Sequence, residues 1–268
     1  MAAFDAVVIL FAGMAAGAMN AVVGAGTLIT FPTLLALGFP PVVANVSNTV
    51  GLVPGAVTGA YGFRATLRGQ THLLWRLATA SAIGGIIGGA LLLVLPPEAF
   101  EQVIPPLLLL SAVLAAAQPR VAAWVTRRRA ARVPETAPDP DAPVEGPPAT
   151  VTPGVALYAI VFSTGIYGGY FGAAQGVILL AVLGIFVAGG MPQVNGIKNV
   201  LAGVANLVSA SLFIAIADVD WRVAGLVAIG ATIGGGLGSR YGRRLPAGPL
   251  RALVVLVALV AAAWQFAT

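Results

Sequence analysis

Long apolar stretches alternate with short polar ones along most of the chain. Most of these stretches are about 17–25 residues long, enough for a helix to cross a hydrocarbon core of about 30 Å. Backbone polar groups in lipid must be satisfied within each segment, which predicts helices, and the short alternating strands of a membrane barrel are missing. The ten predicted segments are 4–19, 23–38, 43–63, 72–95, 100–118, 155–170, 172–188, 196–217, 222–239 and 250–267.

Residues 119–152 interrupt this pattern. They begin with five arginines between Arg120 and Arg132 and continue with prolines interspersed with acidic residues. Such a composition cannot bury enough apolar surface to offset the entropy of ordering, so we predict a disordered linker. The chain is thereby divided into an N-terminal membrane unit, 1–118, and a C-terminal membrane unit, 153–268.

Short motifs recur in the same order in the two units, which indicates an internal repeat. The matching pairs are Gly24–Gly26 with Gly172–Ala174, Asn45–Asn48 with Asn195–Lys198, Trp75–Arg76 with Trp221–Arg222, and Ala82–Gly89 with Ala228–Gly235. Each unit holds an odd number of segments, so the second repeat enters the membrane from the opposite side. The predicted fold is an all-α polytopic membrane protein with two inverted repeats of about five segments, as in many secondary transporters.

The distribution of charge predicts the orientation. With the N-terminus outside, the inner loops carry Arg64, Arg68, the arginines of the linker, Arg240, Arg243 and Arg244, whereas the outer boundaries carry Asp5, Glu98, Asp218 and Asp220. This is the positive-inside pattern, and it places both termini outside and the linker in the cytoplasm. The first two segments of each unit either span the membrane or form a re-entrant hairpin, and both arrangements give the later loops the same sides.

Composition narrows the class of protein. Apolar residues make up 59% of the 268 residues and charged residues 9%, whereas soluble domains have about 25% charged residues. The net charge of +5 is spread between apolar blocks, so no nucleic-acid partner is predicted. The absence of cysteine and the single histidine, His72, leave no basis for a metal site, and no cofactor is predicted.

Polar side chains inside apolar segments are costly and are therefore the first candidates for function. They gather at corresponding places in the two units, beside glycines that would let backbone groups approach a ligand. A helix that starts after such a break points its positive end at the break, which suits an anion. The predicted substrate-binding residues are Asn20, Gly24, Gly26, Thr27, Asn45, Asn48, Tyr170, Gly172, Gln175, Gly176, Asn195, Lys198, Asn199 and Asn206.

Lys198 is the only lysine, and no intramembrane carboxylate is available to pair with it. A buried ammonium needs a partner, which an anionic substrate would supply. The alternative is that Lys198 snorkels to the membrane interface. The asparagines could equally join helices by hydrogen bonds. For the glycines of the two fourth segments, such as Gly84, Gly88 and Gly234, close helix packing is the preferred interpretation.

No acidic side chain lies in the middle of a segment, so the sequence offers no convincing proton relay and no catalytic site. An anion leaving a negative-inside cell gains about 2.3 kcal/mol per charge per 100 mV, which could drive export. A transporter is therefore predicted rather than an enzyme, with an anion channel as an alternative. Whether the chain forms a homodimer stays open.

Four motifs, Asn20–Pro32, Gly169–Gly176, Asn195–Asn199 and Asp220–Trp221, resemble those of the TauE/SafE family of sulfite exporters. Thr27 stands where the family's first motif usually has glycine. The resemblance implies a multi-pass carrier in the cell membrane (plasma or inner membrane). Its substrate would be sulfite or a related small inorganic or organosulfur anion, such as thiosulfate or a sulfonate.

Overall fold

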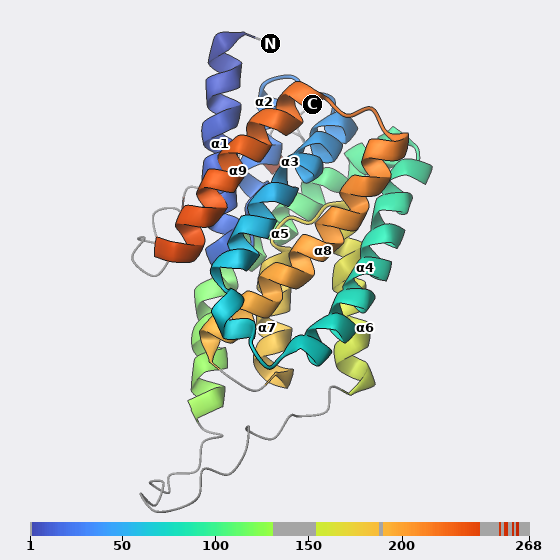
Figure 1. The fold of residues 1–268 in the computed structure, drawn as a ribbon. Helices are drawn as coiled ribbons and strands as arrows, with labels where there is room; N and C mark the ends of the chain where they lie inside the picture. The colour runs from blue at the N-terminus through green and yellow to red at the C-terminus, as the bar shows by residue number, and fades with distance from the viewer. Residues whose placement is uncertain are drawn as a thin grey trace, which may run out of the picture.

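The computed structural model describes residues 2–130, 154–187 and 190–241, together with isolated positions between 252 and 262. Every regular element in this part of the chain is a helix, which confirms the predicted all-α fold (Figure 1). The tenth predicted segment, 250–267, falls largely outside the described residues. The elements are α1 (Ala3–Val22), α2 (Thr27–Ala36), α3 (Pro41–Gly62), the 3₁₀ helix η1 (Arg64–Leu67), α4 (Thr71–Val94), α5 (Pro97–Ala130), α6 (Val155–Tyr170), α7 (Gln175–Phe186), α8 (Met191–Ile216) and α9 (Trp221–Tyr241).

Several helix starts follow directly from the sequence. Pro41 opens α3 and Pro192 lies in the first turn of α8, where the missing N–H of proline costs nothing. Asp220 precedes α9, and its carboxylate accepts hydrogen bonds from the N–H groups of Arg222 and Val223. The Asp220–Trp221 motif therefore includes a helix cap.

The predicted linker 119–152 is wrong over residues 119–130, because α5 continues through Pro119 to Ala130. Val121 and Ala122 pack against a buried apolar cluster, and Val125 is fully buried against Gly184 of α7. The arginines that suggested a linker therefore lie on a helix that also carries these buried apolar residues. Residues 131–153 lie outside the described part of the chain.

Five of the described helices are long and apolar enough to cross a membrane: α1, α4, α5 (Pro97–Arg128), α8 and α9. The chain is thus a polytopic membrane protein. α3 has 22 residues, but Asn45, Ser47, Asn48 and Thr49 make it less apolar. All four of these side chains are buried in the bundle, so they are kept away from lipid.

Two helical hairpins enter the bundle from opposite ends. α1 and α3 both start at the end where the N-terminus lies, and the short α2 runs back between them (Figure 1). The chain after the α1–α2 break lies against α1, since a Cβ on Gly26 would contact the carbonyl oxygen of Ala16. α6 and α7 form the matching hairpin from the other end, where Gln175 donates a hydrogen bond to the Thr164 carbonyl at 3.2 Å. At ten and twelve residues, α2 and α7 are about 15 and 18 Å long, too short to cross alone.

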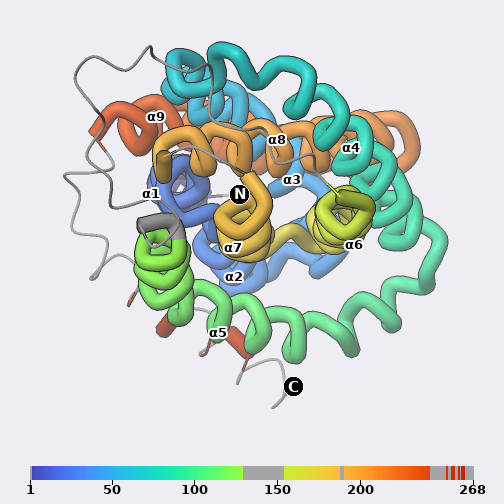
Figure 2. The backbone as a smooth tube through the Cα atoms, turned by 90° about the horizontal axis from the view of Figure 1, so that it is seen from below, coloured from blue at the N-terminus to red at the C-terminus, as the bar shows by residue number. Residues whose placement is uncertain are grey.

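The two halves pack in the same way, with exchanged partners. α9 of the second half packs on α1, as α4 of the first half packs on α6 (Figure 1). α9 also packs on α3, as α4 does on α8. The described helices therefore show the inverted pairing that the sequence motifs indicate. Seen from below, α5 runs along the outside of α2 and α7 (Figure 2).

Glycines set the distances between these helices. A Cβ on Gly84 or Gly88 of α4 would meet the carbonyl oxygen of Phe162 or Ile166 in α6. The equivalent glycines of α9 are fitted in the same way to α1, where Gly234 lies against Met14. The preferred packing interpretation of these glycines is confirmed, because any side chain would push the helix backbones apart.

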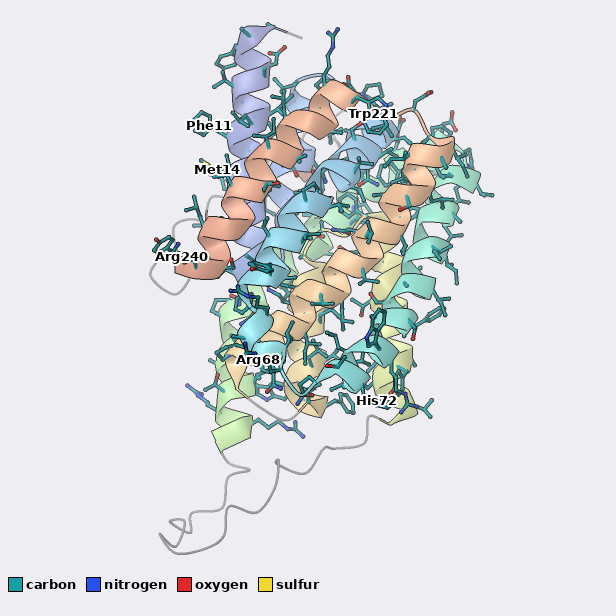
Figure 3. All side chains as sticks on the ribbon, viewed as in Figure 1. Phe11, Met14, Arg68, His72, Trp221 and Arg240 are labelled. Atoms are coloured by element: carbon teal, nitrogen blue, oxygen red, sulfur yellow. The ribbon has the colours of Figure 1, made fainter. Side chains whose placement is uncertain are left out.

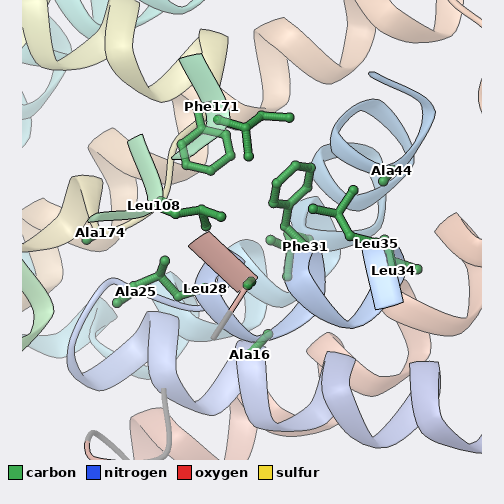
Figure 4. Packing of buried hydrophobic residues seen from close by; sticks show 14 of the residues in the cluster. Ala16, Ala25, Leu28, Phe31, Leu34, Leu35, Ala44, Leu108, Phe171 and Ala174 are labelled. Carbon is green, nitrogen blue, oxygen red and sulfur yellow. The ribbon is translucent and has the colours of Figure 1, made fainter. Parts of the chain in front are cut away.

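Buried aromatic rings fill the space between the hairpins and α5. Phe31 of α2 packs edge-to-face against Phe171, with ring centroids 5.2 Å apart (Figure 4). It also packs against Phe100 of α5, with centroids 6.3 Å apart. Edge-to-face pairs at these separations are favourable. This cluster joins α2 of the first half to the break of the second.

Several basic residues lie at one end of the bundle. Arg68 and His72 lie at the end opposite Trp221 (Figure 3). Arg127 and Arg128 are exposed at the end of α5, which runs from the N-terminal end of the bundle towards the Arg68 end. The side of the membrane that each end faces stays a prediction.

Gly234→Ala is expected to lower the midpoint of thermal unfolding in detergent, because its Cβ would collide with the backbone of Met14. Gly236→Ala is the matched control, since a Cβ there meets nothing within 4 Å. Replacing glycine by alanine in a helix is otherwise worth about 1 kcal/mol. The two variants should therefore shift the midpoint in opposite directions, and equal shifts would contradict the close contact of α1 and α9.

Candidate functional site

A small cavity lies at the centre of the bundle, where the two hairpin breaks meet α3 and α8. It offers about 30 Å³ to the centre of a water-sized molecule, whereas a single water needs roughly 10–15 Å³ on the same measure. Both halves of the chain form its walls. The lining residues are Asn20, Ala21, Gly24, Thr27, Gly55, Ala56, Gly59, Gly172, Gln175, Gly176, Lys198, Asn199, Ala202, Gly203 and Asn206.

The two breaks are in direct backbone contact. The N–H of Gly176 donates a hydrogen bond to the carbonyl oxygen of Gly24 at 3.1 Å. A Cβ on Gly24 would meet the Cα of Gly176, and a Cβ on Gly176 would meet the Cα of Gly24. Because neither position has room for a side chain, glycine is required on both sides of the contact.

Both breaks are built in the same way. Gly24 and Gly172 adopt left-handed conformations, with φ of 83° and 75°. The N–H of Gly24 donates to the Met19 carbonyl at 2.9 Å, and that of Gly172 to the Tyr167 carbonyl at 3.0 Å. A left-handed glycine bonded back to the last turn is a common helix terminus, so each break ends one helix before the next begins.

Polar side chains complete the two breaks differently. The amide oxygen of Asn20 accepts a hydrogen bond from the N–H of Gly26 at 2.7 Å. In the second half, the side chain of Gln175 fills the space beside Gly168 and donates to Thr164. Each bond links residues on the two sides of a break and so holds the hairpin closed.

Lys198 points into the bundle, not to the membrane interface. Its side chain is 1% exposed, and among the described residues it is the only buried charged side chain. Its ammonium donates to the carbonyl oxygens of Asn20 and Ala21 at 3.4 and 3.5 Å, and Asn199 donates to Ala21 at 3.2 Å. The snorkelling alternative does not describe this geometry. An ammonium has three donors, so one stays available to a ligand in the cavity.

Positive ends of helices also face the cavity. α2 begins at Thr27 and α7 at Gln175, and both residues line the wall. The N-terminal end of a helix carries about half a positive charge. Together with the Lys198 ammonium, these two ends make the cavity suited to a small anion.

Nine of the fourteen predicted binding residues line this cavity: Asn20, Gly24, Thr27, Gly172, Gln175, Gly176, Lys198, Asn199 and Asn206. Gly26 lies directly beside it, packed against Asn20. The remaining four, Asn45, Asn48, Tyr170 and Asn195, do not line it.

These four residues have other surroundings. The side chain of Asn45 donates to the Tyr170 carbonyl at 3.0 Å, and the Tyr170 ring packs against Phe100 with centroids 5.6 Å apart. Asn195 donates to the Met191 carbonyl within its own helix at 3.2 Å. Asn48 is fully buried, and neither of its amide atoms has a hydrogen-bond partner within the described residues.

The sequence did not reveal the small residues of the wall. Gly55, Ala56 and Gly59 of α3 and Ala202 and Gly203 of α8 line the cavity, and Gly203 lies directly against Ala56. Their spacing of three and four residues places them on one helix face with the polar residues already noted. That spacing was the available signal, but glycine and alanine are so common in this chain that it did not stand out.

Two inverted helical hairpins that meet at a polar central cavity define the class of inverted-repeat membrane transporters. The particular family follows from comparison with known proteins. Residues 9–264 match the family model described as sulfite exporter TauE/SafE. The chain therefore belongs to the TauE/SafE family and is a membrane transporter.

Individual relatives agree with this assignment. The chain is 22% identical over 259 residues to a protein of Haemophilus influenzae named "Probable membrane transporter protein", covering 96% of this chain and 92% of the relative. It is 26% identical over 263 residues to a Sinorhizobium protein named "Probable membrane transporter protein ORF9", covering 97% and 92%. No solved structure matches the chain.

Gly24→Ala is expected to disrupt the cavity, because a Cβ would separate the two breaks and strain a left-handed residue. Gly38→Ala is the matched control, with the same φ of 83° but nothing within 4 Å of its Cβ. The control should show only the cost of left-handed alanine, about 1–2 kcal/mol. Thermal unfolding of both variants in detergent measures the difference, and an equal loss would contradict the backbone contact.

Proposed function

We propose that this transporter carries sulfite or a closely related small sulfur oxyanion through the central cavity. The observation that carries the proposal is the buried Lys198 ammonium in the wall of a cavity that two helix N-termini also face. A buried cation without a carboxylate is costly, and a bound anion would lower that cost. The name of the family supports sulfite among the possible anions.

The size of the cavity favours a small inorganic anion. Its volume of about 30 Å³ corresponds to roughly two water molecules. Sulfite has only four heavy atoms, so the surrounding helices would need to move apart less for sulfite than for an organosulfonate with a carbon chain. Thiosulfate and sulfonates are therefore secondary candidates, and competition with labelled sulfite for binding to the purified protein would separate them.

The paired hairpins support alternating access. The α1–α2 hairpin reaches the cavity from one end of the bundle and the α6–α7 hairpin from the other. Rocking of one half against the other would then open the cavity to each side in turn. An anion channel would instead give single-channel currents without saturation, which recordings in planar bilayers would detect.

The distribution of charge supports a direction and a location for the proposed transport. With the basic end that holds Arg68 in the cytoplasm, the positive-inside rule is obeyed and the N-terminus lies outside. In a bacterial cell membrane, the potential would then drive an anion outward. The site carries out binding and release, so no catalytic step is assigned to the chain.

Lys198→Met should reduce saturable sulfite uptake into proteoliposomes by about 10- to 100-fold, since a hydrogen bond to a charged group is worth about 1.5–3 kcal/mol. Methionine keeps much of the volume and removes the charge. Arg68→Gln is the control, because it removes an exposed positive charge far from the cavity. Affinity and flux that stay unchanged in a well-folded Lys198→Met protein would rule out Lys198 as an anion ligand.

A further inference from the structure

Asn48 occupies in α3 the place that Lys198 occupies in α8. The motif Asn45–Asn48 corresponds to Asn195–Lys198, and both helices lie in the same surroundings of their repeats. Asn48 is 0% exposed, and neither its amide nitrogen nor its amide oxygen has a hydrogen-bond partner in residues 2–130, 154–187 and 190–241. A buried amide with no partner costs several kcal/mol. A ligand that binds the Asn48 amide would lower this cost.

Asn48 has a second oxygen acceptor one helical turn away. The nitrogen of the Asn45 side chain is bonded to the Tyr170 carbonyl at 3.0 Å, but its oxygen is buried and has no partner within the described chain. Both amide oxygens thus belong to one face of α3, next to the point where α6 ends at Tyr170.

Thr30 brings a third unpartnered oxygen to the same depth. Its hydroxyl is 1% exposed and has no hydrogen-bond partner in the part of the protein that the structure describes. α2 and α3 pack together and are joined by residues 37–40, so Thr30 and Asn48 both lie about 10 Å from that connection. One turn before Thr30, Thr27 lines the cavity, as does Gly55 two turns after Asn48. The two faces therefore lie towards the same central space.

The charge of the neighbouring helix end indicates the kind of ligand. The C-terminal end of a helix is negative and attracts cations. Lys198 of the second half donates its ammonium hydrogens to C-terminal carbonyls of α1 in the first half. At the equivalent end of α6, the contact comes from Asn45, which is neutral. The pseudo-symmetry therefore leaves one helix end with a built-in cation and the other with neutral oxygens.

We propose that Asn48, Asn45 and Thr30 form a binding site for a monovalent cation such as Na⁺ at the C-terminal end of α6. The bound cation compensates the negative C-terminal end of α6, as the Lys198 ammonium compensates that of α1. Neutral amide and hydroxyl oxygens suit a monovalent ion, whereas Ca²⁺ sites are usually built with carboxylates. Interrupted transporter helices commonly coordinate Na⁺ at such ends.

The site has a consequence for transport, and this part rests on the proposed anion function. A cation at α6 and an anion at Lys198 would occupy neighbouring positions around the same two breaks. Binding of either would then favour binding of the other, which would couple anion flux to the cation.

The test measures thermal unfolding of the full chain in detergent, with choline chloride exchanged for NaCl, KCl or LiCl at constant ionic strength and without any sulfur anion. The wild type should show a saturable rise in unfolding midpoint with one of the small cations, because a ligand that binds only the folded state stabilises it. Asn48→Ala should abolish that rise. Ser209→Ala, which removes a buried hydroxyl bonded to Gly85 and Ala205, should retain it.

A second variant keeps the test decisive if Asn48→Ala folds poorly. Asn48→Lys would place an ammonium where the cation is proposed to bind, as Lys198 does in the second half. It should fold and have a midpoint that no longer depends on the cation. A wild type whose midpoint is the same in all four salts, or an Asn48→Lys protein that keeps the saturable rise, overturns the site and leaves buried water as the partner of Asn48.

These outcomes are independent of the proposed anion transport. A cation-dependent midpoint without sulfite flux would contradict the anion proposal alone. Sulfite flux with a midpoint that no cation changes would contradict the cation site alone.

Discussion

The backbone contact between Gly24 and Gly176 is the constraint on which the rest of the structure depends. Irregular backbone at membrane depth is tolerated only where it is buried in protein or lines a cavity. Here each break is satisfied by its own preceding helix, and the Gly176 N–H to Gly24 oxygen bond of 3.1 Å joins the two. Two hairpins can therefore end inside the bundle, and their four helix ends gather at one point.

Close packing around that point follows from the same requirement. The hairpins reach the centre only if α4 and α9 lie close against them, and the glycines facing Ile166 and Met14 permit this approach. α3 and α8 then cross beside the breaks with small residues such as Gly55 and Gly203, which leaves the cavity open. The glycines of this chain thus have two roles. Some allow helices to pack closely, and others line the central cavity without filling it.

The sequence predicted the fold further than it predicted the site. Apolar length and repeated motifs were enough for an all-α membrane bundle, and nine described helices lie close to predicted segments. The predicted end of the fifth segment was wrong, because the arginines after Pro119 indicated a linker although Val125 among them is buried. Charge could not distinguish a span from a hairpin, since both put the later loops on the same side.

For the site, Lys198 and Asn206 stood out by being polar, whereas Ala56 and Ala202 had no chemical signal. The Tyr170 ring packs against Phe100 instead of lining the cavity. The two residues are 70 positions apart, and no local sequence pattern encodes such a contact.

The difference between Lys198 and Asn48 shows what inverted symmetry leaves to the individual side chain. The backbone places two helix C-termini inside the bundle, and both present carbonyl oxygens that need positive charge or hydrogen-bond donors. One repeat meets this need with the covalently attached ammonium of Lys198. The other meets it with amides, whose oxygens have no hydrogen-bond partner among the described residues. Because a fixed charge cannot leave and a bound ion can, the proposed cation site would make the repeat with asparagine the half in which occupancy changes.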